Sequence, residues 1–310
     1  MDRTQQIWYA PLLMKSKLSI LIVTVFSALL AGGCDPVIGG TGSFAVASVP
    51  VLEVEGLHYA AARPVRSMAV YTPPVVVAPV KPKPAIKTTV LGKSRQGRTI
   101  AMTVFGNSGP AMLLFAGIHG NEPQSVAVAK KFMDELRDDP NRFAKCRVAV
   151  IPCASPDGLA KNSRYNSAGV DVNRNFPARS FVPARIYGPK AASEPETRCI
   201  LSAMARLKPV AVISIHTCDR RRRGSTQDRH GNNWDGKGKP LADAMARVNG
   251  YRSFGEWHNK TPGSFGSYAG RDKNLCVVTL EIPNDVSSSS AWSANRKALL
   301  ETIRYTQSQR

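Results

Sequence analysis

The sequence predicts an α/β fold in which helices cover both faces of a mixed, largely parallel sheet, giving three α/β/α layers. Apolar or β-branched runs of strand length recur through the last two thirds of the chain, and segments with helical spacing separate them. The runs are apolar throughout instead of alternating with polar residues, which is typical of strands buried on both faces.

Five strands are expected from these runs, at residues 100–105, 112–117, 147–153, 210–216 and 276–281. Helices are expected where apolar residues recur every three or four positions, at residues 124–136, 194–207, 241–248 and 291–305. In open sheets of this class, ligands bind beyond the carboxyl ends of the parallel strands. We therefore expect the functional residues at those strand ends.

The first 33 residues are expected to be an export signal. The apolar run LSILIVTVFSALL (18–30) follows Lys15 and Lys17, and it is too short to cross a bilayer comfortably. The run ends in LLAGGC, which resembles the lipobox of bacterial lipoproteins, so Cys34 would be the lipid-modified first residue of the mature protein.

Two further details bear on this N-terminal segment. Asp35 follows the cysteine directly and resembles the signal that retains lipoproteins of Gram-negative bacteria at the inner membrane. We expect an exported protein on the periplasmic face of that membrane, with the outer membrane as the alternative. Translation could start at Met1 or at Met14, because MKSKLSIL also reads as the start of a signal peptide.

Residues 34–87 are expected to form a membrane tether. Pro, Val, Ala and Gly dominate this stretch, as in TPPVVVAPVKPKPAIK, and no helical or strand period is sustained. The remaining residues, 88–310, are enough for one domain with a substantial core.

The chain is strongly basic, with a formal net charge of +20. Its clearest basic run is Arg220 to Arg223, in DRRRRG, and no aromatic residues are interleaved with it. This disfavours a nucleic-acid partner. An anionic membrane face or an acidic cell-wall substrate suits an exported basic protein better, and the arginines themselves are expected to lie in a solvated loop.

Residues with metal-binding and acid-base chemistry stand at three of the predicted strand ends. His119 and Glu122 come just after the second predicted strand, His216 closes the fourth and Glu281 closes the fifth. A catalytic zinc site commonly has three nitrogen or oxygen ligands, an open position and a nearby carboxylate that is not a ligand. Glu281 lies in the apolar stretch VVTLEIP, where a carboxylate is costly unless it is paired or functional.

An ordered set of motifs accompanies these residues: HGNE, SPDG, GVDVNRNFP, SIH, TPGSFGSYAG and TLEIP. The set resembles the zinc carboxypeptidase family, and specifically its murein peptide amidase branch, over about residues 91–304. The HExxH pattern of other zinc peptidases is absent. The resemblance implies a zinc peptidase domain with a zinc carboxypeptidase-like fold.

The resemblance also assigns roles to individual residues. It implies that His119, Glu122 and His216 hold one zinc ion. Glu281 would be the general base that activates a water and then the acid that protonates the leaving amine. Cys218 lies two residues past His216, and we expect it to pack instead of binding zinc, because a fourth protein ligand would close the open position.

Four more residues match positions of the family, Arg164 as a catalytic residue and the other three as substrate-binding residues. Asn173 and Arg174 would clamp the terminal carboxylate of the peptide, for which a guanidinium fork is well suited. Arg164 would stabilise the oxyanion of the tetrahedral intermediate, with a surface salt bridge as its alternative role. Tyr268, on a glycine-rich loop, would contact substrate or serve only as a turn residue.

The expected function is zinc-dependent hydrolysis of an amide bond next to a C-terminal carboxylate in a murein peptide. The resemblance implies the bond between γ-D-glutamate and meso-diaminopimelate. A general carboxypeptidase for L-peptides and an N-acyl amino acid deacylase are the alternative hydrolases. A wall-binding lipoprotein without catalysis is the alternative outside enzymes.

Overall fold

The computed structural model describes residues 85–220, 229–255 and 261–309. The expected signal peptide, Cys34, nearly all of the tether and the last three residues of the arginine run lie outside these residues. Within the described part, no helix has both the length and the apolar character needed to cross a membrane.

One eight-stranded sheet runs through the domain in the order β1-β2-β4-β3-β5-β8-β6-β7. Its strands are β1 (Ile86–Lys93), β2 (Thr99–Phe105), β3 (Ala111–Ala116), β4 (Arg147–Ile151), β5 (Ala211–Cys218), β6 (Gly231–Gly236), β7 (Arg252–Gly255) and β8 (Cys276–Pro283). The central strands β4, β3, β5 and β8 are parallel, whereas β1, β2 and β6 join by antiparallel pairing. The predicted mixed, largely parallel α/β sheet is confirmed.

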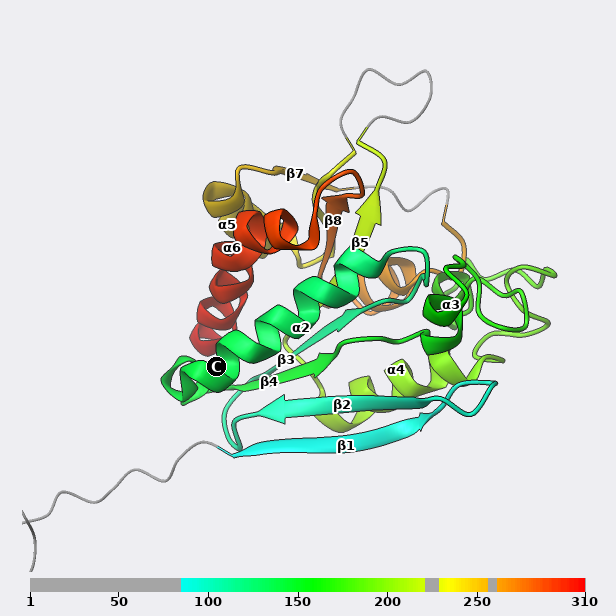
Figure 1. Cartoon of the computed structure of the whole chain (residues 1–310), viewed down its shortest axis with the longest axis horizontal. Helices are drawn as coiled ribbons and strands as arrows, with labels where there is room; N and C mark the ends of the chain where they lie inside the picture. The colour runs from blue at the N-terminus through cyan, green and yellow to red at the C-terminus, as the bar shows by residue number, and fades with distance from the viewer. Residues whose placement is uncertain (1–84, 221–228, 256–260, 310) are drawn as a thin grey trace, which may run out of the picture. The chain divides into compact units, whose positions relative to one another are not determined.

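Helices cover both faces of this sheet (Figure 1). On one face, Met112 and Leu114 of β3 belong to the same apolar cluster as residues of α2 (Pro123–Asp138), α5 (Lys239–Asn249) and α6 (Ser288–Ser308). On the other face, Leu113 and Phe115 of β3 belong to a cluster with residues of α4 (Pro195–Leu207). Because side chains alternate across a strand, one apolar strand supplies both clusters, and this produces the three layers.

The start of α2 is set by its sequence. Pro123 occupies the first turn, where the missing N–H costs nothing and the ring fixes a helical φ. Glu122 occupies the N-cap position without a capping hydrogen bond from its side chain, so it stands at the junction between the loop after β3 and the helix with its carboxylate free for other contacts. The helix then continues to Asp138 with Phe132 and Leu136 fully buried.

Three strands and a short helix were not predicted from the sequence. β1 is an edge strand with mostly exposed residues, so it lacks the apolar signal of the central strands. It begins at Ile86, before the predicted domain start at residue 88. β6 (GNNWDG) and β7 (RSFG) contain Gly, Asn and Asp, which are depleted in strands, and the helix α3 (Pro156–Ala160) has only five residues.

Candidate active site

Two of the expected residues are neighbours across the sheet. His216 of β5 pairs with Glu281 of β8 in parallel register. Both strands run a little past these residues, to Cys218 and Pro283, so the two side chains project from the last part of regular strands and not from loops. Rigid strands therefore fix the separation of the two groups.

His119 and Glu122 come from the short turn between β3 and α2. Gly120, within this turn, lies against the backbone of α3: a Cβ there would stand 1.8 Å from the carbonyl carbon of Gly158. Only glycine permits so close an approach. The HGN turn is thus pressed against α3, and the imidazole and carboxylate on either side of the glycine project into one space.

The structure brings His119, Glu122 and His216 together. The Nδ1 atom of His119 is 2.7 Å from Oε1 of Glu122, and the Nδ1 atom of His216 is 3.1 Å from Oε2 of the same carboxylate. The two Nδ1 atoms are 3.2 Å apart. All three side chains are buried, and their ligand atoms lie within 4.8 Å of one another, so the group could hold a metal ion.

The donor set suits zinc. Nε2 of His119 is 3.1 Å from Oδ1 of Asp171, which is the arrangement in which a carboxylate holds the N–H of a metal-ligating imidazole and turns its other nitrogen toward the metal. The Nδ1 lone pairs of two neutral imidazoles would then face each other at 3.2 Å, and a cation between them removes that repulsion. Two imidazoles and one carboxylate are common ligands of catalytic zinc.

The charges around the group also favour a cation. Burial by itself would lower the pKa of His119, but the carboxylates of Glu122 and Asp171 outweigh burial and raise this pKa to about 9. Burial likewise opposes ionisation of Glu122, yet His119 and His216 hold the pKa of its carboxyl well below the usual range. The site therefore prefers a positive charge between its carboxylates, and a bound metal ion would replace the imidazole proton.

Glu281 has the opposite electrostatic environment. Burial, together with the negative charge of Glu122, raises the pKa of its carboxyl to about 8. A carboxyl whose pKa lies near neutral pH can both take and give a proton at low cost. The arrangement thus separates a carboxylate suited to binding metal from one suited to proton transfer.

Arg164 and Asp171 form an ion pair beside the metal-binding group. Both Nε and Nη2 of Arg164 are 2.9 Å from Oδ2 of Asp171. Nη1 of Arg164 is 3.5 Å from Nδ1 of His119, so the guanidinium faces the site instead of lying on a remote surface. Asp171 was assigned no role from the sequence, although it stands within the motif GVDVNRNFP; its contact with His119 makes it a candidate functional residue.

Asn173 and Arg174 lie on η2, the short helix Val172–Arg174. The Asp171 side chain accepts a hydrogen bond of 2.9 Å from the backbone N–H of Asn173, and Oδ1 of Asn173 accepts one of 2.9 Å from Phe265 N–H. Burial lowers the pKa of Arg174, whose Nη1 donates to the Asn173 carbonyl. The two predicted clamp residues are thus held next to each other, close to the pair Arg164 and Asp171.

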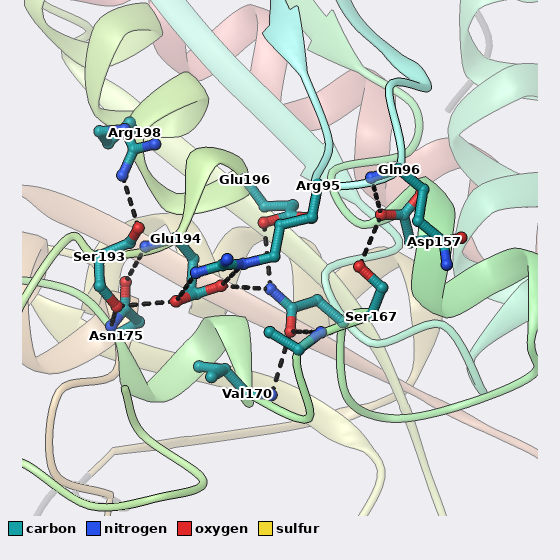
Figure 2. A network of polar contacts seen from close by, with 12 residues as sticks. Arg95, Gln96, Asp157, Ser167, Val170, Asn175, Ser193, Glu194, Glu196 and Arg198 are labelled. Carbon is teal, nitrogen blue, oxygen red and sulfur yellow. Dashed lines mark hydrogen bonds and ion pairs between the residues drawn. The ribbon is translucent and has the colours of Figure 1, made fainter. Parts of the chain in front are cut away.

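A buried polar network supports the segment that carries these residues (Figure 2). Glu194, fully buried, accepts two hydrogen bonds from Arg95 and one from Asn166. The Asn175 side chain donates to the carbonyls of Tyr187 and Lys190, and its Oδ1 accepts from Glu194 N–H. These bonds tie the chain on both sides of η2 to the body of the domain.

One cavity of about 340 Å³ joins the parts of this site. His119, Glu122, His216 and Glu281 line it, and the other described lining residues are Asn121, Arg164, Asn173, Arg174, Thr217, Cys218, Asp219, Arg229, Asn233, Asp235, Thr261, Ser264, Gly266, Thr279 and Asn284. Two of these lining residues, Asn233 and Asp235, belong to β6. They were not predicted as site residues because the sequence did not predict β6 itself.

Two further residues considered in the sequence, Tyr268 and Cys218, lie outside the metal-binding group. Tyr268 is not among the described residues that line the cavity; its ring stacks on Phe176, with the Nζ atom of Lys273 5.0 Å from the ring centre. Cys218 does line the cavity but is not part of the metal-binding group. Burial and the nearby Glu281 raise the pKa of its thiol to about 12, which keeps it protonated at neutral pH.

The family model for zinc carboxypeptidases matches residues 80–221. Murein peptide amidase A of Escherichia coli K12 is 29% identical over 212 residues, covering 62% of this chain and 79% of that protein. Murein peptide amidase A of Vibrio campbellii is 28% identical over 199 residues, covering 55% and 68%.

Solved structures show the same likeness. The murein-tripeptide amidase from Escherichia coli O157 superposes with a TM-score of 0.57 and 27% identity, over 70% of this chain and 91% of that one. Thrombin-activatable fibrinolysis inhibitor superposes with a TM-score of 0.61 but only 17% identity, over 74% and 71%, so it supports the fold alone.

Proposed function

The chain carries a zinc carboxypeptidase domain and is a metallo-hydrolase, and from this premise we propose that it cleaves the bond between γ-D-glutamate and meso-diaminopimelate in murein peptides. The observation that carries the proposal is the convergence of His119, Glu122 and His216 beside Glu281 in one cavity. The murein peptide amidases among the similar proteins support the substrate class.

We propose that one zinc ion is held by His119, Glu122 and His216. Zinc, when bound, supplies a Lewis acid that makes water a better nucleophile and polarises the scissile carbonyl. The raised pKa of Glu281 suits it to take a proton from the attacking water and later to give that proton to the leaving amine. Asp171 would hold the His119 ring in its ligating orientation.

The cations on the cavity wall have separate tasks in this proposal. Arg174, with the Asn173 amide beside it, binds the free carboxylate at the end of the peptide. Arg164 approaches His119 and can donate to the oxygen that becomes negative as water adds. Because Asn173 and Arg174 bind a free carboxylate, the enzyme removes a terminal residue and does not cut within a peptide chain.

We further propose that the protein is an exported lipoprotein, anchored through Cys34 at the periplasmic face of the inner membrane. The support is the apolar run before LLAGGC, the following Asp35 and the Pro-rich stretch that could act as a tether. A palmitate analogue should label the wild-type chain in cells, whereas Cys34→Ser should be unlabelled and released from membranes. Equal labelling of both chains would remove the anchor from the proposal.

The activity is tested by incubating the full chain, loaded with zinc, with the purified tripeptide L-alanyl-γ-D-glutamyl-meso-diaminopimelate. We expect mass spectrometry to show free diaminopimelate, and a chelator to stop its release. The same tripeptide with an amidated C-terminus should be a poor substrate, because the Arg174 clamp loses its anion. Cleavage of α-linked L-peptides alone would instead indicate a general carboxypeptidase.

A further inference from the structure

The register of the strands defines an end of the sheet that lies opposite the catalytic group, and we call it the basal end. β1 begins there at Ile86, which pairs with Phe105 at the end of β2, and Phe105 in turn pairs with Val148 near the start of β4. The parallel strands β3, β5 and β8 also begin at the basal end, and the antiparallel β6 finishes there (Figure 1). Glu281 lies five residues after Cys276, the first residue of β8, so about 17 Å of strand separates the basal end from the reaction.

The basal end carries exposed lysines. Five strands, β1, β4, β5, β6 and β8, each have a lysine within three residues of their basal terminus; in this order the basal lysines are Lys87, Lys145, Lys208, Lys237 and Lys273. All five residues are exposed, and within residues 85–220, 229–255 and 261–309 none of them takes part in an ion pair. Their ammonium groups are therefore open to an anionic partner.

Acidic residues near these loops do not balance the charge. Asp138, Asp139 and Asp272 lie close to the basal lysines in the chain. Asp139 is 3.3 Å from Nε of Arg142, and Asp272 accepts a hydrogen bond of 2.7 Å from the backbone N–H of Arg179, so two of these carboxylates have partners of their own. The basal end thus keeps a surplus of positive charge.

The described part of the chain also starts at the basal end. Ile86, the first residue of β1, is 45% exposed and stands next to Lys87, and Lys81 and Lys83 precede it in the sequence. An exposed apolar residue among lysines is typical of protein surfaces that contact lipid headgroups. The expected tether, residues 34–87, would reach about 160 Å if extended, so attachment through it does not determine which face of the domain meets a membrane.

We propose that the basal end docks through the basal lysines on a membrane surface that carries acidic phospholipids, so that the catalytic cavity faces away from the bilayer. Each lysine held near such a surface changes the equilibrium by about fivefold, and five together make the docked orientation dominate. An anchored enzyme would then present its cavity to the space beyond the membrane. The inference rests on the proposed location at a membrane and not on the reaction that the enzyme catalyses.

The test measures which lysines acidic lipid protects from a reagent. The purified full chain is reconstituted in phosphatidylcholine vesicles, with or without one third of phosphatidylglycerol, and acetylation of each lysine is followed by mass spectrometry. We expect the basal lysines to react at least about fivefold more slowly on the vesicles that contain phosphatidylglycerol. High salt should remove this protection, because it screens the attraction between lysines and headgroups.

Two other exposed lysines are internal controls for this measurement. Lys93 is the last residue of β1, so it lies at the opposite end of the strand from Lys87. Lys161 follows α3, the helix that packs against the turn between His119 and Glu122. Both lysines should react at the same rate on the two kinds of vesicle.

A charge-reversal variant tests whether the lysines cause the docking. In the triple variant Lys145→Glu, Lys208→Glu and Lys237→Glu, the protection of Lys87 and Lys273 should be lost. Circular dichroism and zinc content check that this variant is folded.

The matched control is the triple variant Lys93→Glu, Lys131→Glu and Lys161→Glu, which changes the net charge equally at exposed residues away from the basal end. This control should keep the basal lysines protected. Because no residue changed in either variant is among the described residues that line the catalytic cavity, both should hydrolyse the soluble tripeptide at the wild-type rate.

The inference is overturned if the basal lysines react equally on both kinds of vesicle, if Lys93 and Lys161 are protected as strongly, or if the first triple variant keeps the protection of Lys87 and Lys273. Purified murein sacculi that protect the basal lysines as well as acidic vesicles do would also overturn it, and would assign this surface to the cell wall. Hydrolysis of the tripeptide by the same samples separates the two proposals: hydrolysis without protection contradicts the docking surface alone, and protection without hydrolysis contradicts the proposed reaction alone.

Discussion

Glu281 differs from Glu122 and Asp171, two other buried carboxylates of the site, in the sign of the charges around it. Glu122 and Asp171 both face His119, and the pKa of each carboxyl is lowered although burial opposes this. Glu281 is instead subject to burial and to the charge of Glu122, which raise its pKa to about 8. Neighbouring acidic groups with widely separated pKa values are a recurring sign of divided catalytic roles.

At the residue scale, Glu281→Gln should abolish proton transfer while leaving the metal-binding group intact. We expect the variant to bind zinc as the wild type does and to lose turnover by roughly 100-fold to 10,000-fold, the usual contribution of general acid-base catalysis. Metal analysis and initial rates measure the two properties on the same sample. Turnover close to that of the wild type would remove Glu281 from the mechanism.

The raised pKa of Glu281 also predicts how pH affects the stability of the metal-free protein. Between an unfolded pKa near 4.5 and a folded pKa of about 8, the folded state binds more protons than the unfolded state. The free energy of unfolding should therefore fall, on account of this group, as pH rises from 5 to 8. One pKa unit corresponds to about 1.4 kcal/mol, so the effect should be of the order of a few kcal/mol.

Urea denaturation of chelated wild type and Glu281→Gln isolates this effect, because the titration of His119 is common to both proteins. The stability difference between the two should be small near pH 4 and should grow in favour of the variant up to about pH 8. A difference that stays constant over this range would mean that Glu281 is already ionised in the folded protein.

At the scale of elements, the site depends on the contacts that hold its loops in place beside the sheet. The central strands supply His216 and Glu281, and the turn before α2 supplies His119 and Glu122. By contrast, Asn173 and Arg174 stand on η2, which has only three residues. The buried network around Asn175 and Glu194 is what gives this irregular segment a fixed position (Figure 2).

Asn175→Ala should therefore loosen the clamp. The substitution leaves the carbonyls of Tyr187 and Lys190 and the N–H of Glu194 without these partners, and we expect a loss of about 2–4 kcal/mol in the free energy of unfolding. KM should rise more than kcat falls, because Arg174 binds the terminal carboxylate in our proposal. Chemical denaturation and steady-state kinetics measure both effects.

Arg198→Ala is the control for this prediction. Arg198 donates to the carbonyls of Ala192 and Ser193 in the same segment, but it is exposed, so its loss should cost less than about 1 kcal/mol. If the two variants behave alike, the Asn175 network does not hold η2 in place.

At the scale of the whole molecule, the sequence predicted the parts that follow simple rules. Apolar runs located the central strands, and the ends of those strands located His119, Glu122, His216 and Glu281, because parallel strands present their carboxyl ends at one edge. β6 was missed because GNNWDG has no strand-like pattern. Asn233 and Asp235 were not predicted for the same reason, since only the pairing of β6 with β8 brings them to the cavity.

Other features of the site could not be predicted from the sequence, because they depend on contacts between residues that are distant in the chain. Asp171 could be located in a motif, but its contact with His119 depends on where the fold places the start of η2. Tyr268 was a candidate substrate contact because its glycine-rich loop resembles one of the amidase branch, with a turn role as the alternative. In the structure Gly266 and Gly270 of this loop lie against Asp235, and the Tyr268 ring packs on Phe176. Sequence spacing does not reveal which side of such a loop faces the cavity.

The most direct test is the metal content of the purified full chain, determined by mass spectrometry alongside His119→Ala, His216→Ala and Asp235→Asn. We predict one zinc ion per chain in the wild type and in Asp235→Asn, and a much reduced content in both histidine variants. A wild-type protein without stoichiometric zinc after zinc loading, or histidine variants that bind it as tightly, would contradict the account.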